Sequence, residues 1–265
     1  VKAFNADNAE ELWSRDLARE MRIKSPTWSF AGSAIVSDGK VLVDVGAIVA
    51  LDPRTGRPLW KSENFGAAYS TPRPFEFGSR KLIAAFPASG LVILDASNGR
   101  TVTQHKWKTR YNVNAATPVV HGDNIFISSG YNTGGAMLEL TSRGLRVVWQ
   151  NKNMRNHMET TRLIDGHLYG IDEGQLSCLD AATGEVKWSQ RSIGKGSLTA
   201  AGDKLVVQAA DGQLVIAEAS PDGFESLAEA RPFRSRNCWA APTVVNGRIY
   251  CRSPQGKLVC YTVGD

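Results

Sequence analysis

The sequence predicts an all-β fold, a β-propeller of four-stranded antiparallel blades, and three observations support this prediction. The stretch LDAATGEVKW, from Leu179 to Trp188, nearly repeats LDPRTGRPLW, from Leu51 to Trp60. Equivalent Trp, Thr or Leu positions recur at residues 13, 60, 103, 149, 188 and 227, and these spacings of 39 to 47 residues are typical of propeller blades. No segment shows a sustained helical period of apolar residues.

About six repeats are visible, and each holds three apolar, β-branched runs before the run that carries the recurring position. They span residues 33–60, 71–103, 117–149, 161–188, 198–227 and 241–263. The first turn in a repeat is a hairpin dipeptide such as Asp38-Gly39, Asp165-Gly166 or Asn246-Gly247. Each repeat therefore predicts one four-stranded blade.

The repeated decapeptide has a structural explanation. An Asp such as Asp180 can accept backbone N–H groups two or three residues on, and Gly184 suits the positive φ that closes the turn. Trp188, four residues later, would lie on the outer strand and pack against the neighbouring blade, which stabilises by roughly 2–3 kcal/mol. We therefore interpret the motif as a brace between blades and not as a catalytic site.

Residues 1–265 are expected to form a single propeller domain. The N-terminal LWSRDL could serve as an outer strand and pair with LVCYTV at the other end, which would close a six-bladed ring. However, Val1–Phe4 resembles the end of a third strand. The alternative is an N-terminally truncated fragment of a seven- or eight-bladed parent.

Composition excludes several classes of protein. The net charge of +5 is modest, no apolar run could span a membrane, and no signal peptide is visible. The four cysteines form no CxxC motif, which argues against a zinc knuckle or covalently attached haem.

Cys251 and Cys260 flank a turn and would face each other if Gln255 and Gly256 were its two central residues. The sequence leaves two alternatives: a disulfide between Cys251 and Cys260, or a role for Cys178 and Cys260 as small buried apolar residues.

The segments that leave four successive outer strands share an unusual charge pattern. These linkers, residues 104–113, 150–158, 189–197 and 230–239, contain no Asp or Glu. Their ten basic residues are Lys106, Lys108, Arg110, Lys152, Arg155, Arg191, Lys195, Arg231, Arg234 and Arg236. Because the register of the repeat places all four linkers at one face, they predict a basic surface there.

Aromatic side chains interleave with these charges, and Arg can pair bidentately with carboxylate, phosphate or sulfate. The linkers thus predict a site for an anionic small molecule, an acidic glycan or an envelope protein. The residues expected to form it are Lys106, Lys108, Arg110, Tyr111, Lys152, Arg155, His157, Arg191, Lys195, Arg234, Arg236 and Trp239. Nucleic acid fits the charge but gains no support from the fold, so we do not expect it. The alternative is that the basic linkers form an ordinary solvated surface without a specific ligand.

The histidines do not predict a metal centre. His121 and His167 fall at hairpin turns, whereas His105 and His157 lie on linkers of adjacent repeats and could approach each other. A metal needs further ligands, and neither linker holds a carboxylate. No catalytic motif appears, and GYNTGG near Gly130 is expected to be a hairpin with a flexible tip.

The ALD-PRTG-RPLW and CLD-AATG-EVKW patterns resemble the pyrroloquinoline-quinone-like (PQQ-like) propeller repeat over nearly the whole chain. The resemblance is greatest to large PQQ-like repeat proteins of planctomycete-type bacteria. More distant members include quinoprotein dehydrogenases and a BamB-like outer-membrane assembly lipoprotein, which is a scaffold without a cofactor. The dehydrogenases hold PQQ against two adjacent cysteines and bind calcium through Glu, Asn and Asp. This chain lacks the cysteine pair, and no stretch matches the calcium set.

These observations favour a non-catalytic binding or scaffold protein of the cell envelope, periplasmic or secreted, that recognises an anionic ligand or protein partner with its basic linkers. No cofactor is expected. The alternative is a PQQ- and calcium-dependent quinoprotein dehydrogenase, or a fragment of one. A purely structural scaffold that offers strand edges to partner chains is a third reading.

Overall fold

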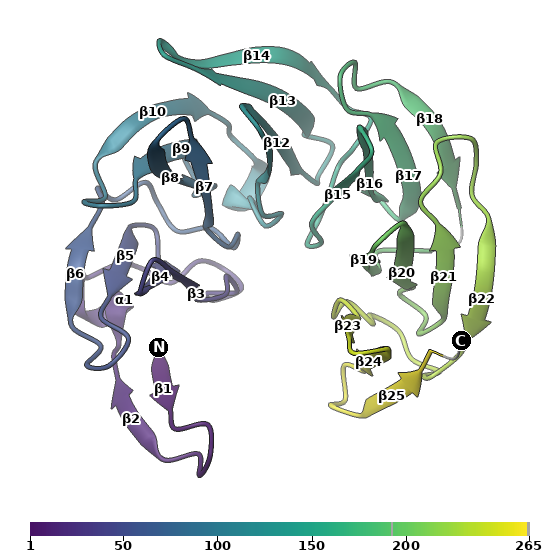
Figure 1. The fold of residues 1–265 in the computed structure, drawn as a ribbon, viewed down its shortest axis with the longest axis horizontal. Coiled ribbons are helices and arrows are strands. Elements are labelled where there is room, and N and C mark those ends of the chain that lie inside the picture. The colour runs from purple at the N-terminus through teal and green to yellow at the C-terminus, as the bar shows by residue number, and fades with distance from the viewer. Residues whose placement is uncertain (192, 264–265) are drawn as a thin grey trace. The chain divides into compact units, whose positions relative to one another are not determined.

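A computed structural model describes residues 1–191 and 193–263, and their regular structure is almost entirely strand (Figure 1). In every sheet the hydrogen-bonded neighbours are consecutive in the chain. Such up-and-down antiparallel sheets are the blades of a propeller, so the predicted all-β propeller class is confirmed.

Among the described residues, five sheets have four strands. The first contains β3 (Ile35–Ser37), β4 (Lys40–Asp44), β5 (Ile48–Leu51) and β6 (Pro58–Lys61). The second contains β7 (Arg73–Phe77), β8 (Arg80–Ala85), β9 (Gly90–Asp95) and β10 (Thr101–Lys106). The third contains β11 (Val119–His121), β12 (Asn124–Ser129), β13 (Gly134–Thr141) and β14 (Gly144–Asn151). The fourth contains β15 (Arg162–Ile164), β16 (His167–Asp172), β17 (Gln175–Asp180) and β18 (Val186–Gln190). The fifth contains β19 (Ser197–Ala201), β20 (Lys204–Gln208), β21 (Leu214–Glu218) and β22 (Ser226–Ala230).

Shorter sheets contain the remaining strands. β1 (Lys2–Phe4) pairs with β2 (Glu11–Ser14), and β23 (Thr243–Val245), β24 (Arg248–Arg252) and β25 (Leu258–Thr262) form a three-stranded sheet. The β1–β2 pairing agrees with the reading of Val1–Phe4 as the end of a third strand. The predicted outer strand LWSRDL is shorter than expected, because Leu17 leaves it to begin the one-turn helix α1 (Leu17–Glu20). Leu17 is buried there, and the Asp16 side chain caps the helix.

The chain divides into two compact units. The first comprises Val1–Ile127 and Leu138–Arg146, and the second comprises Ser128–Met137 and the chain from Val147 onward. Unit 1 thus holds the sheets of β1–β2, β3–β6 and β7–β10, and unit 2 holds those of β15–β18, β19–β22 and β23–β25. The strands of the β11–β14 sheet contribute segments to both units.

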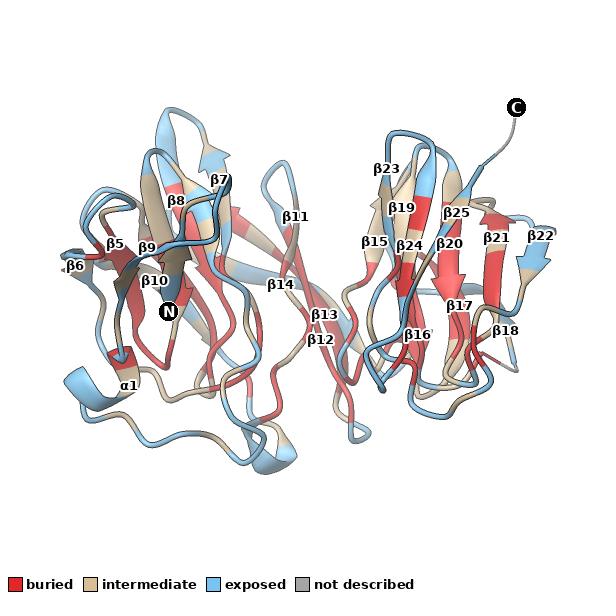
Figure 2. Ribbon diagram, turned by 90° about the horizontal axis from the view of Figure 1, so that it is seen from below, coloured by how far each residue is buried: buried red, intermediate tan, exposed pale blue. Residues whose placement is uncertain are grey.

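In the four-stranded sheets the second and third strands carry the core, whereas the outer strands are largely exposed (Figure 2). In unit 1 an apolar cluster joins Leu42 and Ile48 of the first sheet to Ile83 and Leu94 of the second. Unit 2 has an equivalent cluster between its β15–β18 and β19–β22 sheets. Because each inner strand is covered on both faces, its sequence is a nearly continuous apolar run.

The predicted brace is confirmed. The Asp180 carboxylate accepts hydrogen bonds from the backbone N–H groups of Ala182 and Thr183, each at 2.9 Å, and Gly184 has a φ of 74°. A Cβ on Gly184 would stand 2.6 Å from the ring of Trp149, the tryptophan of the preceding sheet. The Trp149 indole N–H also donates to the Ala181 carbonyl at 2.9 Å. The glycine therefore permits both the turn and the close approach of the ring.

Cys251 and Cys260 do not face each other. Cys260 lies opposite Tyr250, and Cys251 lies opposite Val259, so the two thiols point to opposite faces and both are free. The loop contains Pro254 as well as the two expected residues, and this extra residue shifts the register by one. Cys178 is buried as predicted, but Cys260 is exposed, so the prediction that both are buried was wrong for Cys260.

Candidate functional site at the linker ends of the sheets

Each sheet has two chemically different ends. The outer strand finishes at the same end at which the second strand turns into the third, because the strands alternate in direction. We call this end, with its linker and its turn between the second and third strands, the linker end. The opposite end carries the Asp-Gly braces and the first hairpin turns. All predicted site residues belong to linker ends, and each unit is described separately.

Buried side chains fix the three linkers of unit 2. Met154, Ile193, Phe233 and Cys238 are all buried and pack into the sheets. Ser192 of the linker 189–197 lies outside the described residues. Because the apolar residues anchor each linker, the charged residues between them are held at the surface.

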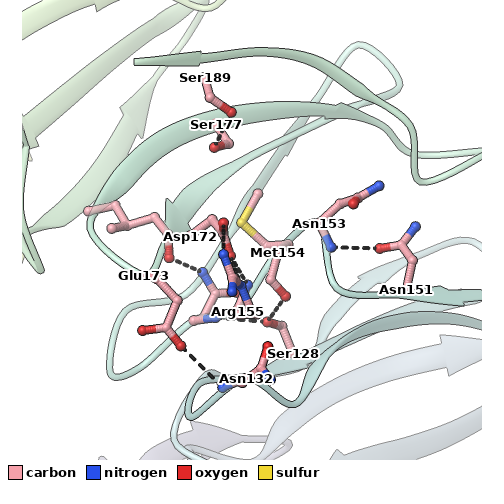
Figure 3. Close-up of polar contacts among 12 residues, drawn as sticks. Ser128, Asn132, Asn151, Asn153, Met154, Arg155, Asp172, Glu173, Ser177 and Ser189 are labelled. Carbon is pink, nitrogen blue, oxygen red and sulfur yellow. Dashed lines mark hydrogen bonds and ion pairs between the residues drawn. The ribbon is translucent and has the colours of Figure 1, made fainter. Parts of the chain in front are cut away.

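Arg155 is engaged by a carboxylate from a neighbouring turn (Figure 3). Its Nε and Nη2 atoms donate to the two oxygens of Asp172, each at 2.7 Å, and its backbone N–H donates to Asp172 Oδ1 at 2.8 Å. The bond to Asp172 raises the pKa of the Arg155 guanidinium, against the effect of partial burial. The pair is largely shielded from solvent, so Arg155 ties the linker to the β16–β17 turn.

His157 is held by the next residue of that turn. Its Nε2 atom lies 2.6 Å from Glu173 Oε2, and the Asn132 backbone N–H donates to Glu173 Oε1 at 3.2 Å. Burial favours a higher pKa for the Glu173 carboxyl, but bonds from His157 and Asn132 and the charges of His157 and Lys195 outweigh it and lower the pKa. The Tyr131 ring packs on His157 with centroids 4.9 Å apart. The hairpin tip expected to be flexible is therefore held in place.

A buried polar network lies beneath this linker. Asn156 donates to Glu159 at 2.7 Å and accepts from Thr161 at 2.8 Å, while its backbone N–H donates to Ser128 at 3.0 Å. Burial raises the pKa of Glu159 to about 7, although its hydrogen bonds act in the opposite direction. The network positions the linker and is too enclosed to contact a large ligand.

The last linker of unit 2 follows the same arrangement. Arg231 pairs with Asp211 of the β20–β21 turn at 2.8 Å, and Ser235 exchanges hydrogen bonds with Gln255 of the β24–β25 turn. The carbonyl of Trp239 accepts from Ser197, whereas its indole ring remains exposed. The linker is fixed by its backbone and presents an aromatic ring to solvent.

Five predicted cations of unit 2 differ from these paired residues. They are exposed and have no ion-pair partner within residues 1–191 and 193–263: Lys152, Arg191, Lys195, Arg234 and Arg236. The structure thus separates Arg155, His157 and Arg231, which anchor linkers, from cations that remain available to a ligand.

The linker of unit 1 has a buried anchor in Trp107, and His105 packs beside it with ring centroids 6.4 Å apart. Lys106 and Lys108 are exposed. Arg110 and Tyr111 lie in a 3-10 turn, η1 (Arg110–Asn112), where the guanidinium carbon stands 4.9 Å from the Tyr111 ring centroid. The predicted residues of this linker are thus brought together at the linker end of unit 1.

Sequence reasoning missed the acidic partners. Asp172 ends β16, and Glu173 and Asp211 lie in turns, so a count of acidic residues in the linkers alone could not show that some linker cations are neutralised. The DEG and ADG turns at these positions were the available signal.

Of the predicted turn histidines, His121 is exposed at the end of β11, and His167 bonds the Asp165 carbonyl at 2.8 Å.

The chain offers a poor fit to PQQ with calcium. Within the described ranges no group of three or more His, Cys, Asp and Glu residues is placed to hold a metal ion. Asp172 and Glu173, two acidic residues beside the linkers, are committed to Arg155 and His157. The sequence also lacks adjacent cysteines, so we derive no chemistry through this cofactor.

Comparison with known proteins accords with the repeat. Residues 1–76, 75–190 and 166–223 match the family described as outer membrane protein assembly factor BamB. The chain belongs to this family. A curated relative with the same description, from Yersinia pestis, is 24% identical over 286 residues, which cover 97% of this chain and 68% of the relative.

Solved structures of this family and of other propellers share the fold. BamB from Moraxella catarrhalis superposes with a TM-score of 0.70 at 22% identity, covering 98% of this chain and 76% of that chain. A quinohemoprotein alcohol dehydrogenase from Comamonas testosteroni gives 0.57 at 13% identity, covering 86% and 45%. The resemblance to PQQ-like repeat proteins is confirmed, and at these identities the structures show the fold alone. No helix among the described residues is long and apolar enough to cross a membrane.

Proposed function

We propose that the protein is a non-catalytic propeller scaffold of the bacterial periplasm, which recognises an anionic ligand or an acidic surface of an envelope protein with the linker ends of its sheets. Membership of a family named for outer-membrane protein assembly supports a protein partner in the envelope. Fold alone hosts many activities, so the argument for binding rests on the site.

The observation that carries the proposal is that the basic linker residues of unit 2 fall into two groups, those paired with carboxylates and those exposed without an ion-pair partner in the described part of the chain. Acidic turn residues neutralise Arg155 and Arg231, whereas Lys195 and Arg234 stand exposed on linkers fixed by buried anchors. Fixed linkers lower the ordering cost of binding, and exposed cations attract anions over a range set by ionic strength. The arrangement therefore suits recognition of negative charge without chemistry.

The test compares two charge reversals in unit 2. Lys195→Glu with Arg234→Glu alters the linker end, and Lys187→Glu with Arg248→Glu makes the same charge change away from it. Calorimetric titration with a 15-residue polyglutamate peptide should show at least tenfold weaker binding for the first variant and little change for the second. Equal losses would contradict a localised site and indicate only the effect of net charge.

A photo-cross-linking residue at Trp239 tests for a protein partner in cells, because this ring is exposed on the linker. Adducts with envelope proteins should form and should disappear in the Lys195→Glu, Arg234→Glu variant. Adducts that persist unchanged would contradict the assignment of these cations. Reversal of Arg155 would be a poor test, since it would leave Asp172 largely buried without its partner.

A further inference from the structure

A small pocket opens at the linker end of unit 1. It has a volume of about 200 Å³ and lies between the loop that follows α1 and the turn η1. Its lining residues are Lys24, Ser25, Pro26, Thr27, Ala67, Tyr111 and Asn112. The loop after α1 interrupts the repeat pattern, so the sequence repeats gave no sign of this pocket.

Three aromatic side chains pack together beside the pocket, and one of them, Tyr111, lines it. Trp28 is 54% exposed and Tyr111 is 51% exposed, and their rings meet edge to face with centroids 6.2 Å apart. Tyr69 is buried beneath them, 5.8 Å from the Trp28 ring, and its hydroxyl accepts from the Trp28 backbone N–H at 3.4 Å. Two large apolar rings are therefore presented to solvent on a buried foundation.

The backbone that presents Tyr111 is constrained. Tyr111 and Asn112 have φ values of 63° and 55°, in the left-handed region that non-glycine residues rarely adopt. Asn114 is buried below and fixes the turn, because its side chain donates to the Pro87 carbonyl at 2.7 Å and its carbonyl accepts from the Tyr69 N–H at 3.1 Å. Surrounding contacts thus hold an exposed ring in an unfavourable backbone conformation, a feature found at ligand clamps.

The charge around the pocket has one sign. Lys24 lines it, Arg110 stacks on the Tyr111 ring, and Lys108 lies two residues before Arg110. The lining contains no acidic residue, and these three cations have no ion-pair partner in the described part of the chain. Charge complementarity therefore favours an occupant that carries negative groups beside a ring.

We propose that this pocket receives one aromatic side chain of an extended, acidic segment of a partner protein, with flanking carboxylates on Lys24 and Arg110. The volume suits one ring-sized side chain and is smaller than the 300–1,000 Å³ typical of sites that enclose a whole small molecule. The rings of Trp28 and Tyr111 supply the apolar and edge-to-face contacts, and the cations set the preference for acidic neighbours. This inference rests on the proposed function, since it names the kind of partner segment that the linker end of unit 1 would bind.

The test uses the whole chain and the pentapeptide acetyl-Asp-Asp-Phe-Asp-Asp-amide. Nuclear magnetic resonance titration should move the indole N–H signal of Trp28, and replacement of the peptide's Phe by Ala should weaken binding by at least tenfold. The variant Trp28→Ala and the double variant Lys24→Glu, Arg110→Glu should each weaken it by about tenfold. Phe4→Ala and the double variant Arg54→Glu, Arg57→Glu make matched changes elsewhere in unit 1 and should leave the affinity unchanged.

A further variant separates binding from folding. Tyr111→Gly removes the ring and also relieves the positive φ, so we expect thermal stability to hold or rise while peptide affinity falls. Retained affinity in this variant would overturn the proposal. So would equal binding of the Ala peptide, or displacement of the peptide by an alginate trisaccharide at lower concentration, which would indicate an acidic glycan as the occupant.

The two proposals can fail independently. If polyglutamate binding depends on Lys195 and Arg234 but the affinity for the pentapeptide is unchanged by substitution of Trp28 and Tyr111, the inference on unit 1 is wrong and the proposed function stands. If neither probe binds, or if both bind regardless of every substitution, both proposals are wrong.

Discussion

Two tryptophans at equivalent positions of the repeat should respond differently to the same substitution. The indole N–H of Trp188 donates to the Ser220 carbonyl at 2.8 Å, and its ring lies 6.1 Å from those of Tyr169 and Phe224. Trp60 packs against Gly99 of the next sheet, and its indole nitrogen is buried without a hydrogen-bond partner in the described residues. Replacing each tryptophan by phenylalanine therefore isolates the contribution of the polar atom.

The expected magnitudes follow from these contacts. The smaller ring removes roughly 40 Å² of apolar contact, which costs about 1 kcal/mol at either position. At Trp188 the lost hydrogen bond adds about 1 kcal/mol, so Trp188→Phe should lower the free energy of unfolding by about 2 kcal/mol. At Trp60 the removal of an unsatisfied buried donor offsets the lost contact, because such a group costs about 1–3 kcal/mol. Trp60→Phe should therefore be close to neutral or stabilising.

Urea unfolding followed by circular dichroism measures both effects, provided that the slope of the transition stays the same in each variant. The midpoint should fall for Trp188→Phe and stay within error, or rise, for Trp60→Phe. An equal loss at both positions would refute the reasoning, because it would show that ring packing alone determines the strength of the brace.

Three further predictions concern stability. Gly184→Ala should cost about 2–4 kcal/mol, because its Cβ would meet a tryptophan ring at 2.6 Å. Gly39 has a similar positive φ but nothing within 4 Å of such a Cβ, so Gly39→Ala should cost only about 1 kcal/mol, and urea midpoints measure both. Burial raises the pKa of Glu159 to about 7, so the folded state holds a proton that the unfolded chain releases above pH 4.5. The free energy of unfolding should therefore fall by up to about 3 kcal/mol between pH 4.5 and 7. Glu159→Gln should remove that part of the pH dependence. Arg155→Met and Asp172→Asn should each lower the free energy of unfolding by about 2–4 kcal/mol, because each leaves a largely buried partner unpaired. The double variant should lose less than the sum of the two single losses. Strictly additive losses in this double-mutant cycle would contradict a coupled ion pair.

The fold could be predicted because its signals are local and repeated. In the two matching decapeptides the Asp, Gly and Trp lie within nine residues, and the structure forms the turn at Asp180 and Gly184 as its chemistry requires. Register was harder, since one additional loop residue, Pro254, moved Cys260 to the opposite face from Cys251. A pattern of period two cannot reveal such a shift when the loop length is misjudged.

The candidate site was predictable only in part. The sequence identified the basic linkers, but it could not show which cations are neutralised, because Arg155 meets Asp172, which lies 17 positions further along the chain. Nor could it find the pocket beside Trp28, which depends on a loop outside the repeat and on Tyr111 in a conformation that its sequence does not favour.

Both units use one physical design at their linker ends. A buried side chain, Trp107 in unit 1 or Phe233 in unit 2, fixes the linker, and polar residues from a neighbouring turn hold its backbone. Exposed cations and an exposed ring, Tyr111 or Trp239, then stand on a framework that is already ordered. A scaffold gains from this arrangement because a partner that binds ordered linkers loses little conformational entropy in the protein. Variation of the exposed residues could therefore change the partner without disturbing the braces, which lie at the other end of each sheet.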